Sequence, residues 1–258
     1  MQLSFYKYQG TGNDFIIIDN RQLVFDKNNT KLVASLCDRK FGIGADGLIL
    51  LEDDSDTDFK MVYYNSDGNQ SSMCGNGGRC IVAFANYLGI IEKTASFMAI
   101  DGLHHALYDE GEVKLQMTDV TKVSHFKEYS FLNTGSPHHV QMCENLKEKD
   151  IKKLGAAIRY GKYGTSGSNI NFVEHLHNNE FKVRTYERGV EDETLSCGTG
   201  VTAVAIAVYD TNLTLSNHVI LHTPGGKLEV SFEKSGEEFT QIFLKGPATL
   251  VFKGEITC

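Results

Sequence analysis

The chain contains 258 residues, of which 41% are hydrophobic and 22% charged, a composition typical of a globular protein. Acidic residues number 33 against 25 basic ones, and the net charge of −8 argues against a surface for nucleic acid or anionic membranes. The first residues show no secretory signal, and no apolar run approaches the roughly 18 residues of a membrane helix, so we expect a cytoplasmic protein.

The first half of the chain reads mainly as strands around one apolar helix. Runs of β-branched and aromatic residues predict strands over 15–19, 48–52 and 59–65, and the stretch 30–40 favours a surface helix. A further helix is predicted over 77–88 and ends at Gly89. We expect a β-hairpin over 105–117, with its turn near Glu110 and Gly111.

The second half shows the same kinds of element. A surface helix is predicted over 150–160, a strand over 181–187 and a helix over 200–210 that is apolar almost all round. Such a helix is typical of one that strands surround. A hairpin over 218–232, bending at Pro224, Gly225 and Gly226, precedes strands over 241–246 and 249–254.

An internal repeat relates the two halves. The string Cys74-Gly75-Asn76-Gly77 recurs as Cys197-Gly198-Thr199-Gly200, each time just before one of the two apolar helices. A tyrosine lies eleven residues before each cysteine and a glycine 28 residues after it, at Tyr63, Tyr186, Gly102 and Gly225. These matched offsets predict two copies of one unit that divide near residue 118 and face each other across a cleft.

The repeated cysteines are the strongest chemical signal. Six cysteines lie along the chain without a Cys-x-x-Cys pair, so neither a zinc ribbon nor a disulfide framework is indicated. Cys74 and Cys197 are predicted at helix N-termini, where N–H groups and the helix dipole favour negative charge, so both thiols should ionise readily. One such thiol could take an α-proton from one face of a carbon while the other delivers a proton to the opposite face. We interpret the other four as ordinary buried or surface thiols: Cys37, Cys80, Cys143 and Cys258.

Six motifs in order resemble those of the diaminopimelate epimerase family: GTGNDF at 10–15, GIGADGL at 42–48, the segment 64–80, TGSPHHV at 134–140, SNINFV at 168–173 and the segment 186–200. The resemblance implies an α/β (α+β) fold of two pseudo-symmetric halves, each a mixed, mostly antiparallel sheet curled around a central buried helix. It assigns one half to 1–117, completed by the strand 246–258, and the other to 118–245, with the active site in the cleft between them. It implies interconversion of LL- and meso-2,6-diaminopimelate on the route to lysine and peptidoglycan, by a cytoplasmic homodimer with no cofactor and no metal.

The resemblance also implies roles for individual residues. Cys74 and Cys197 match the catalytic thiols, and His138 and Glu187 match residues that tune them. The backbone of Gly75-Asn76 and of Gly198-Thr199 matches the groups that grip the reacting carboxylate. The other substrate-binding positions are Asn13, Asn65, Asn169, Glu187 and Arg188.

Two positions depart from the family pattern, because Ser136 stands where many members have Asn and Gly47 where many have Gln. An alternative function is a proline or hydroxyproline racemase, but that family typically has a histidine where this chain has Asn76. A phenazine-biosynthesis-like isomerase would lack the twin cysteines. A thiol redox protein or a metal-binding protein is a further alternative, although no short-spaced pair of metal ligands supports it.

Overall fold

The computed structural model describes residues 2–257, which fold as two compact units. Unit 1 extends to Leu115 and resumes at Gly246, whereas unit 2 is the continuous segment Gln116–Lys245. The first crossing between the units therefore falls two residues before the boundary that we expected from the repeat.

Unit 1 is a mixed sheet with two helices. Its strand order is β17-β1-β2-β3-β4-β5-β6-β7, in which β2–β3 and β4–β5 are parallel and the other neighbours antiparallel. Its elements are β1 (Gln2–Gly10), β2 (Asn13–Asp19), α1 (Thr30–Cys37), β3 (Gly47–Glu52), β4 (Phe59–Asn65), α2 (Gly75–Tyr87), β5 (Thr94–Ala99), β6 (Gly102–Asp109), β7 (Glu112–Gln116) and β17 (Thr249–Thr257).

Unit 2 has the strand order β8-β9-β10-β11-β12-β14-β15-β16, with β10–β11 and β12–β14 parallel and the other neighbours antiparallel. A short strand, β13, also pairs with the end of β12. Its elements are β8 (Val123–His125), β9 (Ser130–Asn133), β10 (Pro137–Met142), η1 (Leu146–Glu148), α3 (Ile151–Tyr163), β11 (Asn169–His177), β12 (Glu180–Glu187), β13 (Asp192–Thr194), α4 (Gly198–Asp210), β14 (His218–Thr223), β15 (Gly226–Ser235) and β16 (Glu238–Pro247).

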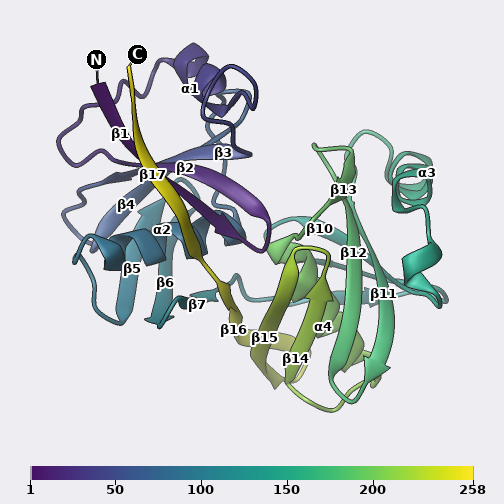
Figure 1. Cartoon of the computed structure of the whole chain (residues 1–258). Helices are drawn as coiled ribbons and strands as arrows, with labels where there is room; N and C mark the ends of the chain where they lie inside the picture. The colour runs from purple at the N-terminus through teal and green to yellow at the C-terminus, as the bar shows by residue number, and fades with distance from the viewer. Residues whose placement is uncertain (1, 258) are drawn as a thin grey trace. The chain divides into compact units, whose positions relative to one another are not determined.

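The two units share one topology, which confirms the predicted fold class. The sequence of antiparallel and parallel pairs is the same in both sheets, from the edge strands β17 and β8 to the last strands β7 and β16. Helices also enter at matching points: α1 and α3 follow the third strand of the shared order, and α2 and α4 come after the fifth. Figure 1 shows this succession within each unit.

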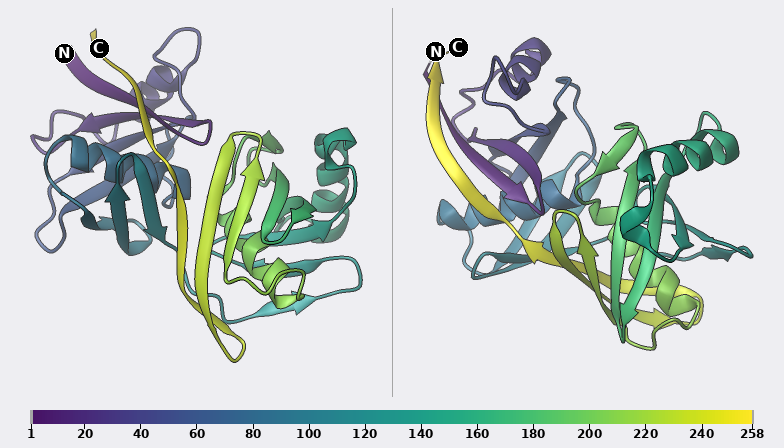
Figure 2. Two further views of the ribbon diagram at one scale, coloured as in Figure 1. Left: turned by 60° about the horizontal axis from the view of Figure 1, so that its bottom comes forward. Right: turned by 45° about the vertical axis from the view of Figure 1, so that its right-hand side comes forward.

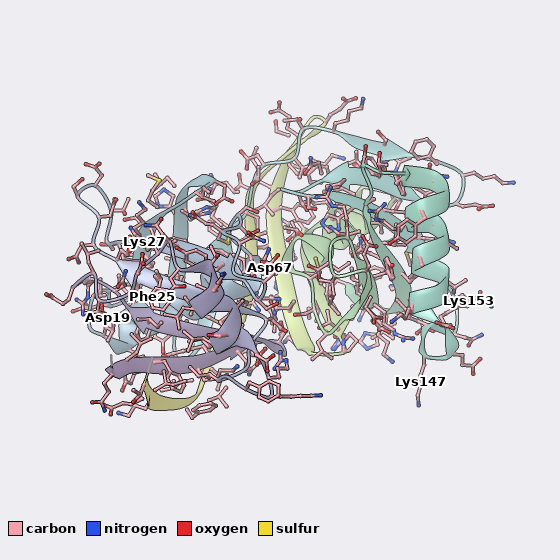
Figure 3. The ribbon with its side chains drawn as sticks, turned by 90° about the horizontal axis from the view of Figure 1, so that it is seen from above. Asp19, Phe25, Lys27, Asp67, Lys147 and Lys153 are labelled. Atoms are coloured by element: carbon pink, nitrogen blue, oxygen red, sulfur yellow. The ribbon has the colours of Figure 1, made fainter. Side chains whose placement is uncertain are left out.

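Each sheet has a buried helix on one face and a more exposed helix on the other. Along α4, all residues from Gly200 to Val208 are buried, as expected from its all-round apolar sequence. On the opposite faces, α1 packs on Ile16 and Leu48 in unit 1, and α3 packs on Ile170 and Phe172 in unit 2. Figure 3 shows Lys153 of α3 at the outer surface, with Lys147 of η1 nearby, as predicted for a surface helix.

The strand β1 lies between β2 and β17, and its pattern does not stand out in the sequence. It pairs antiparallel with β17 from Gln2 opposite Thr257 to Gln9 opposite Thr249. The first and last strands, β1 and β17, therefore lie side by side in unit 1, as both views of Figure 2 show.

Strand register defines which residues of the two units correspond. Gly47 pairs with Phe15 and with Asn65 in unit 1, and Asn169 pairs with His138 in unit 2. Phe15 therefore corresponds to His138, and Gly47 to Asn169. Two residues further along these strands, Ile49 corresponds to Asn171, and their partners on the next strand, Tyr63 and Thr185, correspond to each other. The counterpart of Tyr186 is Tyr64, since both pack beneath the outer helices, and that of Gly102 is Gly226.

This register corrects the offsets read from the sequence by one residue. Tyr63 and Tyr186 stand eleven residues before their cysteines, but they lie on opposite faces of their sheets. The connection between strand and cysteine is one residue longer in unit 2, and a shift of one position reverses the face of a strand residue.

Candidate active site

Each central helix begins directly after a cysteine of the repeat. Cys74 and Cys197 occupy the N-cap positions in extended conformation, with φ −93° and ψ 130° for Cys74 and φ −125° and ψ 112° for Cys197. Neither side chain caps its helix by a hydrogen bond. Both thiols therefore stand at the positive end of a helix dipole, beside first-turn N–H groups suited to an anion. We call Cys74 with its neighbours half-site 1, and Cys197 with its neighbours half-site 2.

Half-site 1 is organised around the amide of Asn13, the first residue of β2. Its Nδ2 donates to Asp46 Oδ2 at 2.6 Å, which leaves Oδ1 facing the helix. That oxygen accepts hydrogen bonds from Asn76 Nδ2 at 3.2 Å and from the Cys74 thiol at 3.6 Å. Three predicted site residues, Asn13, Cys74 and Asn76, thus meet within unit 1.

An ionic network that includes Asp46 fixes the orientation of the Asn13 amide. Arg39 forms ion pairs of 2.7 Å with both Asp14 and Asp46, and Lys7 pairs with Asp14 at 2.7 Å. Burial opposes ionisation of Asp14, but the hydrogen bonds and charges of Arg39 and Lys7 outweigh it and lower its pKa to about 2. Because Asp46 accepts from Asn13, this network sets the direction in which the Asn13 amide points.

The buried side chain of Arg79, on α2, contacts the first turn of the same helix. The side chain of Arg79 is fully buried and donates to the carbonyls of Gly75 and Pro247 and to Thr11 Oγ1, at 3.3, 3.4 and 3.2 Å. Among the ion pairs of residues 2–257 none involves this guanidinium. Burial lowers the pKa of Arg79, yet a guanidinium stays charged at any ordinary pH. Sequence reasoning missed this residue.

Half-site 2 is organised around His138, on β10. Its Nε2 lies 3.0 Å from the hydroxyl of Thr199, which in turn lies 3.5 Å from Cys197 Sγ. His138 is completely buried, and burial together with the charge of Arg188 lowers its pKa to about 3, so the ring is neutral near pH 7. The adjacent His139 turns away to Tyr163, as expected for neighbours in an extended strand.

Two buried residues that the motif analysis did not select complete half-site 2. Asn171 Nδ2 lies 3.1 Å from His138 Nδ1, and Asn171 Oδ1 accepts a hydrogen bond from the Thr185 hydroxyl at 2.9 Å. Asn171 follows Asn169 at the spacing that places both on one face of β11. A second polar residue within an apolar strand is the signal that could have identified it.

Asn169, Ser136 and Arg188 form the rim of half-site 2. Asn169 Nδ2 donates to Ser136 Oγ at 3.0 Å, and its Oδ1 accepts from the Arg188 backbone N–H at 2.8 Å. The Arg188 guanidinium donates to the Ser166 carbonyl at 3.0 Å and to Ser136 Oγ at 3.5 Å. Ser136, a departure from the family pattern, therefore links two predicted binding residues. Glu187 is half-buried at the end of β12, next in sequence to Arg188.

The remaining positions lie at the ends of β3 and β4. Asn65 is the exposed last residue of β4 and pairs with Gly47. A Cβ on Gly47 would lie 2.6 Å from the Tyr63 ring and 2.6 Å from the Tyr64 carbonyl oxygen. A side chain at position 47 therefore has no room while Tyr63 keeps this position, and its hydroxyl lies 3.1 Å from where that Cβ would be.

Within residues 2–257, no helix is long and apolar enough to cross a membrane. The same residues contain no group of three or more His, Cys, Asp or Glu side chains placed to hold a metal ion. Cys37 and Cys80 are buried thiols away from the repeat geometry, and burial raises the pKa of each to about 12. Cys258 lies outside the described residues.

Comparisons with known proteins agree along nearly the whole chain. The family model described as diaminopimelate epimerase matches residues 5–123 and 130–251. A diaminopimelate epimerase of Flavobacterium psychrophilum is 62% identical over 256 residues, covering 98% of this chain and 100% of that protein. One from Aquifex aeolicus is 38% identical, with 99% and 98% of the two chains covered.

Solved structures support the fold at much lower identity. A phenazine biosynthesis protein of the PhzF family from Bacillus anthracis superposes with a TM-score of 0.81 at 13% identity, covering 100% of both chains. A hydroxyproline epimerase from Agrobacterium vitis gives a TM-score of 0.72 at 13% identity, covering 99% of this chain and 92% of that one. These two likenesses concern the fold alone.

Proposed function

This chain belongs to the diaminopimelate epimerase family, isomerases of lysine biosynthesis (EC 5.1.1.7), and from that premise we propose that Cys74 and Cys197 are its acid–base pair. The substrate is 2,6-diaminopimelate, and the reaction inverts one α-carbon between the LL and meso forms. The observation that carries the proposal is the duplication: each unit places one thiol at the N-terminus of its buried central helix.

Proton transfer between two thiols accounts for the inversion. One cysteine, as thiolate, accepts the α-proton, and the electron pair of the broken C–H bond delocalises into the adjacent carboxylate. The other cysteine, as thiol, then donates its proton to the opposite face of the same carbon, and the roles reverse for the other isomer. Each turnover leaves the charges of the two sulfur atoms exchanged.

The helix N-termini stabilise the charge that develops on the carboxylate. We assign this task to the backbone N–H groups of Gly75-Asn76 and of Gly198-Thr199, which belong to the first turns of α2 and α4. Fixed N–H dipoles directed at a developing anion lower the barrier without reorganising during the reaction. This grip supplies part of the stabilisation for which other enzymes use a cofactor.

The polar residues around each thiol suit a substrate with two ammonium and two carboxylate groups. We propose that the guanidinium of Arg188 binds a carboxylate and that the carboxylate of Glu187 binds an ammonium group. The amides of Asn13, Asn65 and Asn169 complete the binding positions. His138 and Glu187 tune the thiols.

Proton NMR in D2O tests this function directly. With reduced protein and LL-diaminopimelate, we expect deuterium at the α-position and appearance of the meso isomer, and neither with Cys74→Ala or Cys197→Ala. Proline serves as the control substrate. Exchange of proline in place of diaminopimelate would assign the protein to the racemases, and full activity of either cysteine variant would overturn the two-thiol mechanism.

We further propose a cytoplasmic homodimer that works without metal or organic cofactor, on the basis of the family resemblance. Light scattering should then give twice the 28.6 kDa mass of the chain. Activity should survive dialysis against a strong chelator. A monomeric mass, or activity restored only by added metal, would contradict these assignments.

A further inference from the structure

We propose that Asn171 is a positioning residue, which holds the His138 ring in the tautomer that carries its hydrogen on Nε2 and so directs the Thr199 hydroxyl toward Cys197. The inference rests on the proposed role of Cys197 as one of the two acid–base thiols. It concerns three side chains on the strands that pack against α4, in which Thr185 contacts Asn171 and Asn171 contacts His138. We call these three residues the polar layer behind Cys197.

The orientation of the Asn171 amide is fixed on both sides. Its Nδ2 donates to the backbone carbonyl of His139 at 2.9 Å, and a carbonyl oxygen can only accept. Its Oδ1 accepts from the Thr185 hydroxyl at 2.9 Å. Turning the amide over would set two oxygens against each other beside His139. The second hydrogen of Nδ2 therefore points at His138 Nδ1, 3.1 Å away.

A fixed donor at Nδ1 determines where the ring carries its own hydrogen. The ring of His138 is wholly buried and neutral, so one nitrogen bears hydrogen and the other a lone pair. Because Nδ1 faces an N–H donor, the hydrogen sits on Nε2. Asn169 Nδ2 gives one hydrogen to Ser136 Oγ at 3.0 Å and lies 3.4 Å from Nε2, which is a longer contact than the 3.1 Å from Asn171 to Nδ1, so Asn171 decides the tautomer. The Nε2 hydrogen is thus available to Thr199, at 3.0 Å.

The effect passes through one hydroxyl to the sulfur. Since Thr199 Oγ1 accepts from His138, its single hydrogen can point to Cys197 Sγ, 3.5 Å away. A donor directed at sulfur favours the thiolate over the thiol. In the opposite tautomer, Nε2 would accept the Thr199 hydrogen, and Cys197 would lose this donor.

Unit 1 shows that the fold itself does not require this layer. The counterparts of His138, Asn171 and Thr185 are Phe15, Ile49 and Tyr63, of which the first two are completely buried and apolar. Burying three linked polar groups has a desolvation cost that an apolar core avoids. The same strands and helix form in both units, so the polar layer serves half-site 2 specifically.

The fit between the amide and the helix is also close. A Cβ added at Gly200, in the first turn of α4, would lie 2.6 Å from Asn171 Oδ1 and 3.3 Å from Cys197 Sγ. Asn171 therefore packs directly beneath the turn that carries the thiol. This contact leaves little freedom for the amide to turn or to move away.

Nitrogen-15 NMR of histidine side chains in the resting protein tests the tautomer without substrate. In the wild type, we expect the two-bond couplings between the ring nitrogens and the carbon-bound ring hydrogens of His138 to show the pattern of the tautomer that carries its hydrogen on Nε2. Asn171→Asp places a carboxylate acceptor beside Nδ1 and should move the hydrogen to Nδ1. A wild-type ring with hydrogen on Nδ1 would overturn the proposal.

A second measurement follows the thiol itself. The pH midpoint for alkylation of Cys197, read by peptide mass spectrometry, should rise by about one unit in Asn171→Leu, which has similar shape and no charge. Thr185→Val should raise it less, and Thr185→Ser, which keeps the hydroxyl, should restore the wild-type midpoint. The midpoint of Cys74 should not move in any of the three variants.

The outcomes separate this inference from the proposed function. An unchanged Cys197 midpoint in Asn171→Leu, in a variant that keeps the wild-type circular dichroism spectrum, overturns the positioning role even if epimerisation is confirmed. If deuterium exchange of diaminopimelate fails while the tautomer and midpoint behave as expected, the proposed function falls and the hydrogen-bonded layer stands. Loss of activity in Asn171→Leu with unchanged tautomer and midpoint would also count against it.

Discussion

The two half-sites have the same backbone design and opposite chemical surroundings. In half-site 1, the Cys74 thiol meets Asn13 Oδ1, an acceptor that Asp46 holds in place from behind. In half-site 2, Cys197 meets the Thr199 hydroxyl, which, in the His138 tautomer proposed above, accepts from His138 and is left with a hydrogen to donate. An acceptor favours the protonated thiol and a donor favours the thiolate, so duplication of a fold does not duplicate the chemistry of its site.

The layer beneath each helix differs as well. At the sixth residue counted from each cysteine, α2 carries Arg79 and α4 carries Thr202. Both donate to the carbonyl four residues earlier, at 3.3 Å from Arg79 to Gly75 and 2.9 Å from Thr202 to Gly198. Unit 1 thus carries a buried cation on its central helix α2, whereas unit 2 carries its buried polar groups on the strands β10, β11 and β12 that pack against α4.

Replacing these paired residues gives the largest expected contrast. Arg79→Met leaves three acceptors without their donor, two of them backbone carbonyls, and should lower the free energy of unfolding by about 3–5 kcal/mol. Thr202→Val removes one hydrogen bond and should cost about 1 kcal/mol. Urea unfolding of the two variants measures both. A smaller cost for Arg79→Met would show that the cation does not hold the helix to its surroundings.

The paired glycines of the first turns offer a second contrast. A Cβ at Gly200 would lie 2.6 Å from Asn171 Oδ1, whereas one at Gly77 would lie 3.2 Å from Ile49 Cδ1, the end of a flexible side chain. Gly200→Ala should therefore destabilise by about 2 kcal/mol and Gly77→Ala by less than about 1 kcal/mol. Thermal unfolding compares them, and equal losses would contradict the difference in packing.

Alkylation of the resting protein tests the acceptor and donor assignment. We expect Cys197 to be modified with a pH midpoint about one unit below that of Cys74, because Cys197 faces the Thr199 hydroxyl as a donor whereas Cys74 faces the acceptor Asn13 Oδ1. Thr199→Val should raise the midpoint of Cys197 and leave that of Cys74 unchanged. Thr199→Ser, which keeps the hydroxyl, is the matched control. A lower midpoint for Cys74 in the wild type would reverse the assignment.

Acidification should affect unit 1 through Asp14, with the smallest effect of the four. Its pKa is lowered to about 2, so the stability that its carboxylate provides is complete above about pH 4 and is lost as the pH falls toward 2. Asp14→Asn should make the protein less stable near neutrality and flatten this part of its pH dependence. Urea midpoints at several acidic pH values measure the slope. An equally steep slope in the variant would exclude Asp14 as its source.

The main elements, and the positions of Cys74 and Cys197 at helix N-termini, are predictable from the sequence because they depend on local patterns. Periodicity marks α2 and α4, although each begins two residues before its predicted start. The hairpin turn at Glu110 and Gly111 is also as predicted, with positive φ at both residues. The repeat around the cysteines survives in the strings CGNG and CGTG, and the resemblance of six motifs is confirmed by the family match.

The layer behind the thiols depends on which residues face each other across strands, and sequence spacing does not give that. Because unit 2 has one extra residue before its cysteine, the sequence offsets match Tyr63 with Tyr186, although the two tyrosines lie on opposite faces of their sheets. Asn171 and Thr185 are ordinary strand residues until the register sets them side by side at 2.9 Å. Arg79 stands alone as a charged residue in a helix that reads as apolar, and nothing in the sequence shows that its guanidinium is fully buried.

The pairing of β1 with β17 has a consequence for how the protein is made. Unit 2 is one continuous stretch, whereas the sheet of unit 1 lacks its edge strand until unit 2 and then β17 have been translated. At roughly 5–20 residues per second, the ribosome leaves the open edge of β1 without its partner for on the order of ten seconds or more. The unit that is synthesised first is thus the last to be completed, and during that interval an exposed strand edge is available to chaperones or to another nascent chain.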